Sequence, residues 1–109
     1  TPLYSSAASD VYKRQHPDKQ EAFTKWKEVG MKRTLAVSGV VEFRGYRGLA
    51  GVPDHLVTFE FVDLAAYATW RSSEEIRKVL DELHTLAINF TTELWGPSLF
   101  VPMPIRPSK

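Results

Sequence analysis

An acidic residue inside an apolar segment is the first candidate for chemistry in this sequence. Glu60 lies in the middle of the otherwise apolar segment Leu56–Val62. A carboxylate that is desolvated beside apolar groups has a raised pKa and can serve as a general base. A cross-strand ion pair with Arg44 is the structural alternative, because charged pairs across strands also keep acidic residues in sheets. Glu60 is therefore a candidate catalytic residue, and an ion pair with Arg44 is the alternative explanation for its position.

Two histidines are the other candidates for acid–base chemistry. His84 lies near the edge of the apolar face of a predicted helix, where it could act as a base or as a haem ligand. A solvated histidine, or one bonded to the last carbonyls of the helix, is the alternative. His55 begins a predicted strand directly after Pro53 and Asp54, where it could equally be a turn residue. His16 borders a segment that we exclude below and carries no functional weight.

Three aromatic residues could shape a binding pocket. Trp26, Tyr67 and Trp70 could surround a planar or hydrophobic ligand, since aromatic side chains often line pockets. Core packing between helices and sheet is the alternative, and we expect it for at least one of the three. The expected ligand is a small aromatic or hydrophobic molecule.

A polar face runs along one predicted strand. Glu42, Arg44 and Tyr46 alternate there with apolar or small residues. We favour a salt-bridge ladder that faces solvent or a second subunit over a substrate clamp. Exposed ion pairs of this kind are common, and each contributes little to stability. Arg44 remains a candidate substrate-binding residue under the second interpretation.

Composition excludes several classes of function. The chain has 109 residues, 14 basic and 13 acidic side chains and a net charge of +1, so we expect neither a nucleic-acid nor an anionic-membrane partner. No apolar run approaches the ~20 residues of a spanning helix. The absence of cysteine excludes disulfides and thiolate catalysis. No phosphate loop, metal-ligand spacing or catalytic triad is present, and we expect no cofactor and a cytoplasmic protein.

The element that carries Trp26 is a predicted helix. It opens at His16-Pro17-Asp18, where proline suits the first turn and the acid suits the positive end of the helix dipole. Gly39 is a good helix stop. Helical spacing places several residues on one apolar face, with lysines opposite. These residues are Ala22, Phe23, Trp26, Val29 and Gly30.

Glu60 and Arg44 belong to a predicted hairpin, and a helical segment follows it. Val40–Arg47 and Leu56–Val62 alternate in character from residue to residue, and glycines lie between them. Asp63 can cap a helix that reaches Trp70, and Ser72-Ser73-Glu74-Glu75 offers a capping box for the segment that carries His84. The last predicted strand is Ile88–Trp95, followed by an extended proline-rich tail.

Residues 1–15 do not match the rest of the chain. Asp10–Gln15 resembles the translation of a transposon end used in sequencing libraries, so we expect this segment to be non-native and residues 16–109 to form one domain. The predicted order is helix, strand, strand, helix, strand. A preceding strand would complete a ferredoxin-like βαββαβ fold, with a four-stranded antiparallel sheet and two helices on one face. Ala8–Gln15 is the only candidate for that strand.

The chain resembles the dimeric α/β-barrel superfamily, and within it the proteins similar to antibiotic-biosynthesis monooxygenases. The resemblance rests on helix spacing and on three segments: Ser38-Gly39-Val40, Phe59-Glu60-Phe61-Val62-Asp63 and Tyr67–Glu74. It implies a homodimer whose two sheets pack together, with each pocket between one sheet and its helices. It also implies that Thr58, Glu60 and Val62 face the pocket, and that Val57, Phe59 and Phe61 face the other side.

Each enzyme subfamily is matched in part. Quinone-forming monooxygenases carry asparagine and tryptophan where this chain has Thr58 and Val62, although Tyr67 matches a pocket tyrosine. Haem-degrading members are similar around Trp70, but their haem-ligating histidine falls at Leu80, with His84 one turn further on. Small polyketide cyclases begin the third strand with a pocket histidine, and His55 is similar in position.

These resemblances lead to one preferred hypothesis and two rivals. The preferred function is a small cofactor-free monooxygenase-like or cyclase-like enzyme. It would act on an aromatic or polyketide-like molecule by proton abstraction or oxygenation, with Glu60 or His84 as the base. The rivals are a non-catalytic dimeric module for small-molecule binding or stress response, and a haem-binding protein.

Overall fold

The computed structural model describes residues 3–10, 17–50, 55–86 and 90–108, and the elements follow in the order expected of the predicted fold. They are β1 (Tyr4–Asp10), α1 (Pro17–Ala36), β2 (Glu42–Arg47), β3 (His55–Phe61), α2 (Leu64–Arg71), α3 (Glu74–Leu86) and β4 (Thr91–Trp95).

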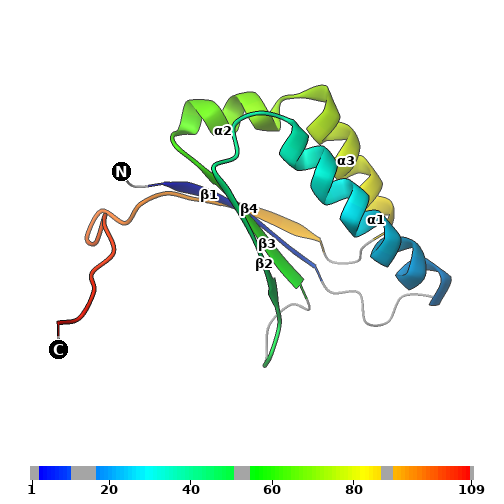
Figure 1. Cartoon of the computed structure of the whole chain (residues 1–109), viewed down its shortest axis with the longest axis horizontal. Helices are drawn as coiled ribbons and strands as arrows, with labels where there is room; N and C mark the ends of the chain where they lie inside the picture. The colour runs from blue at the N-terminus through cyan, green and yellow to red at the C-terminus, as the bar shows by residue number, and fades with distance from the viewer. Residues whose placement is uncertain (1–2, 11–16, 51–54, 87–89, 109) are drawn as a thin grey trace.

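The strands form one antiparallel sheet in the order β2-β3-β1-β4. The helices cover one face of this sheet, as Figure 1 shows. This is the ferredoxin-like βαββαβ arrangement, so the predicted fold class is confirmed. The second helical segment consists of two helices, α2 and α3, which meet at an angle (Figure 1).

The first strand begins earlier than predicted. β1 starts at Tyr4 rather than Ala8, and residues 11–15 of the predicted strand lie outside the described residues. β1 occupies an interior position between β3 and β4, where Ser6 and Ala7 are buried. Small side chains suit that interior position. The non-native origin of residues 1–15 stays a prediction, which sequencing of the genomic locus would test.

The helix caps follow the sequence with one exception. The Asp63 carboxylate accepts a hydrogen bond from the Ala66 amide at 2.8 Å and starts α2 as predicted. The Ser73 hydroxyl accepts one from the Ile76 amide at 3.1 Å and starts α3. The predicted return contact of Glu75 in a capping box is wrong, because this carboxylate instead accepts a hydrogen bond from Arg33 of α1.

The core lies between α2, the start of α3 and the middle of the sheet. Phe61 and Ile76 are fully buried, and Phe59 and Trp70 are nearly so. The Trp70 ring lies 5.0 Å from the Phe59 ring and 5.1 Å from the Phe61 ring between centroids. Such aromatic contacts contribute beyond the area that they bury. Gly39, which leads from α1 into β2, has a φ of +125°, a conformation that favours glycine.

Among the described residues, helix α1 makes its closest backbone contacts with α3. Two of the residues predicted on its apolar face, Ala22 and Val29, are exposed. Trp26 is half-buried and Gly30 is buried on the side that faces the sheet and α3. The predicted apolar face is therefore too wide, since only a narrow stripe of α1 is buried. A cavity lies between that stripe, α3 and the sheet.

The outer face of the sheet is more polar than predicted. The register places Glu42, Arg44 and Tyr46 of β2 opposite Glu60, Thr58 and Leu56 of β3 on that face. After β4 the tail runs away from the body (Figure 1), and Leu99 and Phe100 in it are exposed. None of the described helices has the length and apolar content needed to cross a membrane.

Candidate functional site

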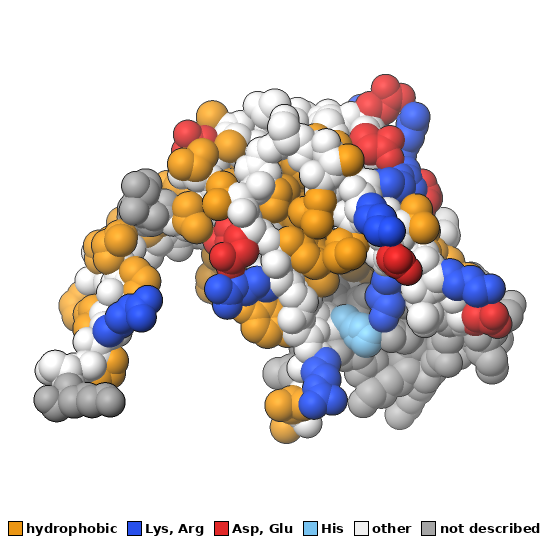
Figure 2. Space-filling model, viewed as in Figure 1, with side chains coloured by type: hydrophobic (Ala, Val, Ile, Leu, Met, Phe, Trp, Pro, Cys, Tyr) orange, Lys and Arg blue, Asp and Glu red, His pale blue; other side chains and the backbone are white. Residues whose placement is uncertain are grey.

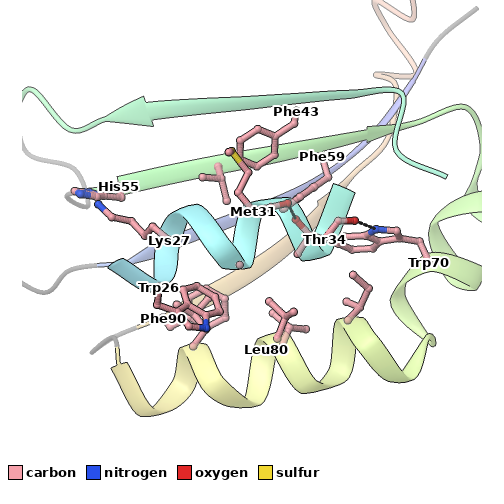
Figure 3. A pocket seen from close by; sticks show the side chains of 15 residues that line it. Trp26, Lys27, Met31, Thr34, Phe43, His55, Phe59, Trp70, Leu80 and Phe90 are labelled. Carbon is pink, nitrogen blue, oxygen red and sulfur yellow. Dashed lines mark hydrogen bonds between the residues drawn. The ribbon is translucent and has the colours of Figure 1, made fainter. Parts of the chain in front are cut away.

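A cavity of about 280 Å³ lies between the sheet, α1 and α3. Figure 2 shows apolar side chains in the hollow beside α1, with charged side chains around it, and Figure 3 shows the walls from close by. The wall residues come from all three helices, from β2 and β3, and from the residue just before β4. They are Trp26, Lys27, Gly30, Met31, Thr34, Phe43, His55, Val57, Phe59, Trp70, Ile76, Val79, Leu80, Leu83 and Phe90.

The end of the cavity beside α2 is continuous with the core. The Trp70 indole nitrogen donates a hydrogen bond to the Thr34 carbonyl oxygen at 3.1 Å, which joins α2 to α1 (Figure 3). The Phe59 ring packs between Trp70 and Phe43, with centroid distances of 5.0 Å to each. These contacts give the cavity a fixed aromatic wall at this end.

A polar cluster outside the cavity holds Trp26 in place. The Trp26 indole nitrogen donates to the Glu82 carboxylate at 2.9 Å, and Arg33 Nη1 lies 2.8 Å from both oxygens of the same carboxylate. Arg33 Nε donates to Glu75 at 2.6 Å. A Cβ added at Gly30 would lie 2.7 Å from the Trp26 ring, so the indole covers the helix at this glycine. The orientation of Trp26 is therefore fixed from two sides.

The same cluster shifts two pKa values. Hydrogen bonds from Arg33 and then from Trp26 lower the pKa of Glu82, because both donors stabilise the ionised carboxylate. Hydrogen bonds to Glu82 and Glu75 raise the pKa of Arg33. The ionised form of Glu82 thus links α1 to α3 and orients a wall of the cavity.

The opposite end of the cavity carries its ionisable groups. Lys27 of α1 and His55 of β3 lie near one another there, as Figure 3 shows. Both residues are half-buried, and the Nδ1 atom of His55 is buried. The strand register places Arg47 of β2 beside His55 on the same face of the sheet. Lys27 and His55 therefore mark the end of the apolar cavity that lies away from Trp70.

Three of the predicted site residues meet in this cavity, namely Trp26, His55 and Trp70. Tyr67 does not line it; its ring packs on the edge of Phe61 with a centroid distance of 5.4 Å. His84 is exposed, and its ring contacts Phe90, which does line the cavity, at 4.9 Å.

The prediction that Thr58, Glu60 and Val62 face the pocket is wrong. Val57 and Phe59 line the cavity, so the alternation of the strand turns Thr58 and Glu60 to the outer face. Burial decides the side, because a strand turns its most apolar set of residues towards the core.

The alternative for Glu60, an ion pair with Arg44, is not the contact that the structure shows for that arginine. Arg44 hydrogen-bonds to Glu42 on its own strand. Glu42 instead lies directly opposite Glu60 in the register. Arg44 belongs to the outer face and takes no part in the cavity wall.

Sequence reasoning missed several wall residues, among them Lys27, Thr34, Phe43 and Phe90. The spacing of Trp26, Gly30 and Thr34 along one helix face was a usable signal for Thr34. Phe43 follows from its register with Phe59 once the inward side of β3 is known. Among the described residues, no group of histidine, aspartate and glutamate side chains is arranged to hold a metal ion.

Comparison with known proteins supports the fold. No protein-family model matches the chain, and no curated protein sequence does. Solved structures do match. One is a dabb-family protein with a ferredoxin-like fold from Mesorhizobium loti, with a TM-score of 0.71 and 19% identity over 90% of this chain and 99% of that one.

Two further solved structures are similar. The hydroxynitrile lyase from Passiflora edulis has a TM-score of 0.69 and 12% identity over 89% of this chain and 94% of that one. A dimeric ferredoxin-like protein of unknown function from Thermobifida fusca has a TM-score of 0.66 and 13% identity, over 87% of this chain and 91% of that one. At these identities the likeness establishes the fold.

Proposed function

We propose that this domain binds a small, apolar, ring-containing molecule in the cavity between α1, α3 and the sheet. The observation that carries the proposal is a cavity of about 280 Å³ with almost entirely apolar walls, in which Trp26 and Trp70 are each fixed by an indole hydrogen bond. Ligand pockets are typically lined by hydrophobic and aromatic groups with a few polar ones, and the smallest hold ~300 Å³. One or two fused rings fit this volume.

Binding of a neutral aromatic probe tests this proposal. We expect 2-naphthamide to bind and to quench tryptophan fluorescence, because Trp26 and Trp70 line the cavity. The matched control is Trp95→Phe, which removes the exposed tryptophan of β4. Quenching that persists in this variant and is clearly reduced in Trp26→Leu would support the cavity as the site. Quenching that depends on Trp95 alone, or no binding, would contradict it.

A second candidate function is proton-transfer catalysis in the same cavity. The observation that favours it is His55, a side chain capable of acid–base chemistry that lines an apolar wall. His55 therefore replaces Glu60 and His84 as the proposed base. It would accept a proton from carbon in an enolisable substrate, and the carbanion formed could cyclise, eliminate or react with oxygen without a cofactor.

Activity of His55 variants separates binding from catalysis. If the domain is an enzyme, His55→Gln should abolish exchange of an enolisable proton of a bound aromatic ketone while it leaves binding of the ketone intact. A wild-type protein that binds such ketones without any exchange favours the binding module. A Soret band on addition of haem would favour the haem-binding alternative instead, although His84 lies outside the cavity wall.

We also propose that the domain is a homodimer in which the outer faces of two sheets meet. One row across that face runs from Arg44 through Thr58 and Ala7 to Glu93. A two-fold axis along the strands brings the basic end of this row opposite the acidic end in the other copy. The solved structures with this fold include dimers. Self-complementary charge of this kind suits a two-fold interface.

Charge reversal tests the dimer and its orientation together. Sedimentation should show a dimer for the wild-type protein, and Arg44→Glu or Glu93→Arg alone should weaken association because like charges then meet. The double variant should restore it. A wild-type monomer at micromolar concentration would contradict the dimer. Single variants that associate normally would contradict the orientation.

A further inference from the structure

The tail after β4 carries large apolar side chains that are exposed in the single chain. Leu99 is fully exposed, Ile105 is 78% exposed and Met103 is half exposed. The tail runs away from the sheet and helices (Figure 1), and Figure 2 shows apolar side chains along it. Exposed apolar surface that is concentrated in one place marks interaction sites in soluble proteins. The tail therefore offers a surface to a partner.

The apolar residues of the tail alternate along the chain. Residues that precede proline favour extended backbone, and Pro102 and Pro104 lie within this segment. In an extended chain every second side chain lies on the same side, so Phe100 falls on the other side. The prolines also lower the conformational entropy that docking would cost. We call residues 99–105 the apolar arm, and its apolar row is Leu99, Val101, Met103 and Ile105.

The end of the sheet from which the arm leaves carries a second exposed apolar surface. β2 begins and β3 ends there, and α2 follows directly. β4 ends there too, because Trp95 pairs with Ser5 of β1 and Ser5 pairs with Glu60 of β3. Three apolar side chains at this end are about half exposed. They form the sheet-end patch, which consists of Val41, Val62 and Leu64.

The two-fold axis proposed above brings the arm of one copy to the sheet-end patch of the other. An axis along the strands keeps each end of the sheet at its own level, and it places β4 of one copy across from β2 of the second copy. The four residues from Trp95 to Leu99 span up to ~13 Å, whereas stacked sheets lie ~10 Å apart. The arm is therefore long enough to reach the patch.

We infer that the apolar arm packs on the sheet-end patch of a second copy, so that the two copies exchange arms. This inference rests on the proposed dimer and adds the segment that joins its copies. The two-fold symmetry makes the contact twice, and each contact buries apolar side chains that are exposed in the single chain.

Cross-linking between different chains tests the contact. The sequence has no cysteine, so single thiols can be introduced. A Leu99→Cys chain and a Val62→Cys chain with different affinity tags are co-expressed and treated with a short bis-maleimide. We expect a covalent species that carries both tags. Lys78→Cys is the control for Val62→Cys, because its side chain is 60% exposed on α3, on the helical side of the sheet, and should not be joined.

Sedimentation of serine variants measures what the arm contributes to association. Leu99→Ser combined with Ile105→Ser should raise the dimer Kd by about a hundredfold, because two apolar contacts per arm are each lost twice. Leu49→Ser is the matched control. Leu49 is 80% exposed in the loop after β2, at the opposite end of the sheet, and its replacement should leave the Kd unchanged.

The outcomes separate this inference from the dimer on which it rests. A wild-type monomer at micromolar concentration contradicts both. A dimer in which the two tags are not joined, or in which Lys78→Cys is joined equally, overturns the arm contact and leaves the dimer. A dimer Kd that is unchanged in the double serine variant does the same. If Leu99→Cys and Val62→Cys in one chain give mainly cross-linked single chains, then the arm folds onto its own sheet and the inference is wrong.

Discussion

The layer between helices and sheet is closed at one end and open at the other. Beside α2, Phe61 and Ile76 are fully buried against the ring of Trp70. Beside α1 the same layer holds the cavity. There the hydrogen bonds of Arg33 to Glu75 and Glu82 join α1 to α3. The candidate binding site therefore lies in the part of this layer that side chains do not fill. The variants below test this difference between the two ends.

The largest expected effect is at the closed end. Phe61→Ala should lower the free energy of unfolding by about 3–5 kcal/mol, because it removes a fully buried ring and leaves a cavity among aromatic neighbours. Urea denaturation measures this loss. Phe100→Ala is the matched control, since Phe100 is 93% exposed in the tail and its replacement should change stability by less than ~0.5 kcal/mol. Equal losses in the two variants would mean that the core is placed wrongly.

The next effect concerns the hydrogen bonds that link α1 to α3. Arg33→Gln should cost about 1 kcal/mol of stability, a modest value because Arg33 and its partners are partly exposed. The pKa of Glu82 is lowered in the folded protein, so the unfolded chain binds the proton more tightly. The stabilisation is therefore complete above the ordinary value near 4.5 and disappears as the pH falls through the folded pKa.

The pH dependence of Glu82→Gln checks that sign. The wild-type protein should be more stable than this variant at pH 7, and the difference should narrow below about pH 4. Urea midpoints at several pH values measure it. A stability difference that stays constant with pH would show that the ionised carboxylate does not form the link.

At the open end the expected effect is on binding more than on stability. Trp26→Leu should weaken binding of 2-naphthamide by about tenfold, because the ring loses one aromatic face. Trp26→Phe is the milder change, since it keeps a smaller aromatic wall and removes the hydrogen bond to Glu82. Isothermal titration compares the two variants. If both weaken binding equally, then the orientation of the indole matters and the area of the wall does not.

The sequence predicts the fold better than the site. Strand alternation, the Asp63 cap and the helical spacing are local signals, and they gave the order of elements. The site depends on contacts between distant residues, such as Arg33 with Glu82, that no local pattern contains. Transfer of pocket positions from the resembling family also placed Glu60 on the wrong side, although the apolar residues on either side of it, Phe59 and Phe61, indicated the inward side.

The smallest expected effect comes from replacing Glu60, and this variant tests directly which face of the sheet the residue lies on. It lies opposite Glu42 on the outer face, and like charges directly opposite each other destabilise a sheet. Glu60→Gln should therefore leave probe binding unchanged and raise stability by a few tenths of a kcal/mol at matched protein concentration. Urea denaturation and titration with 2-naphthamide measure the two quantities. Loss of binding in this variant would return Glu60 to the candidate site, because no residue on the outer face should contribute to a cavity beneath the helices.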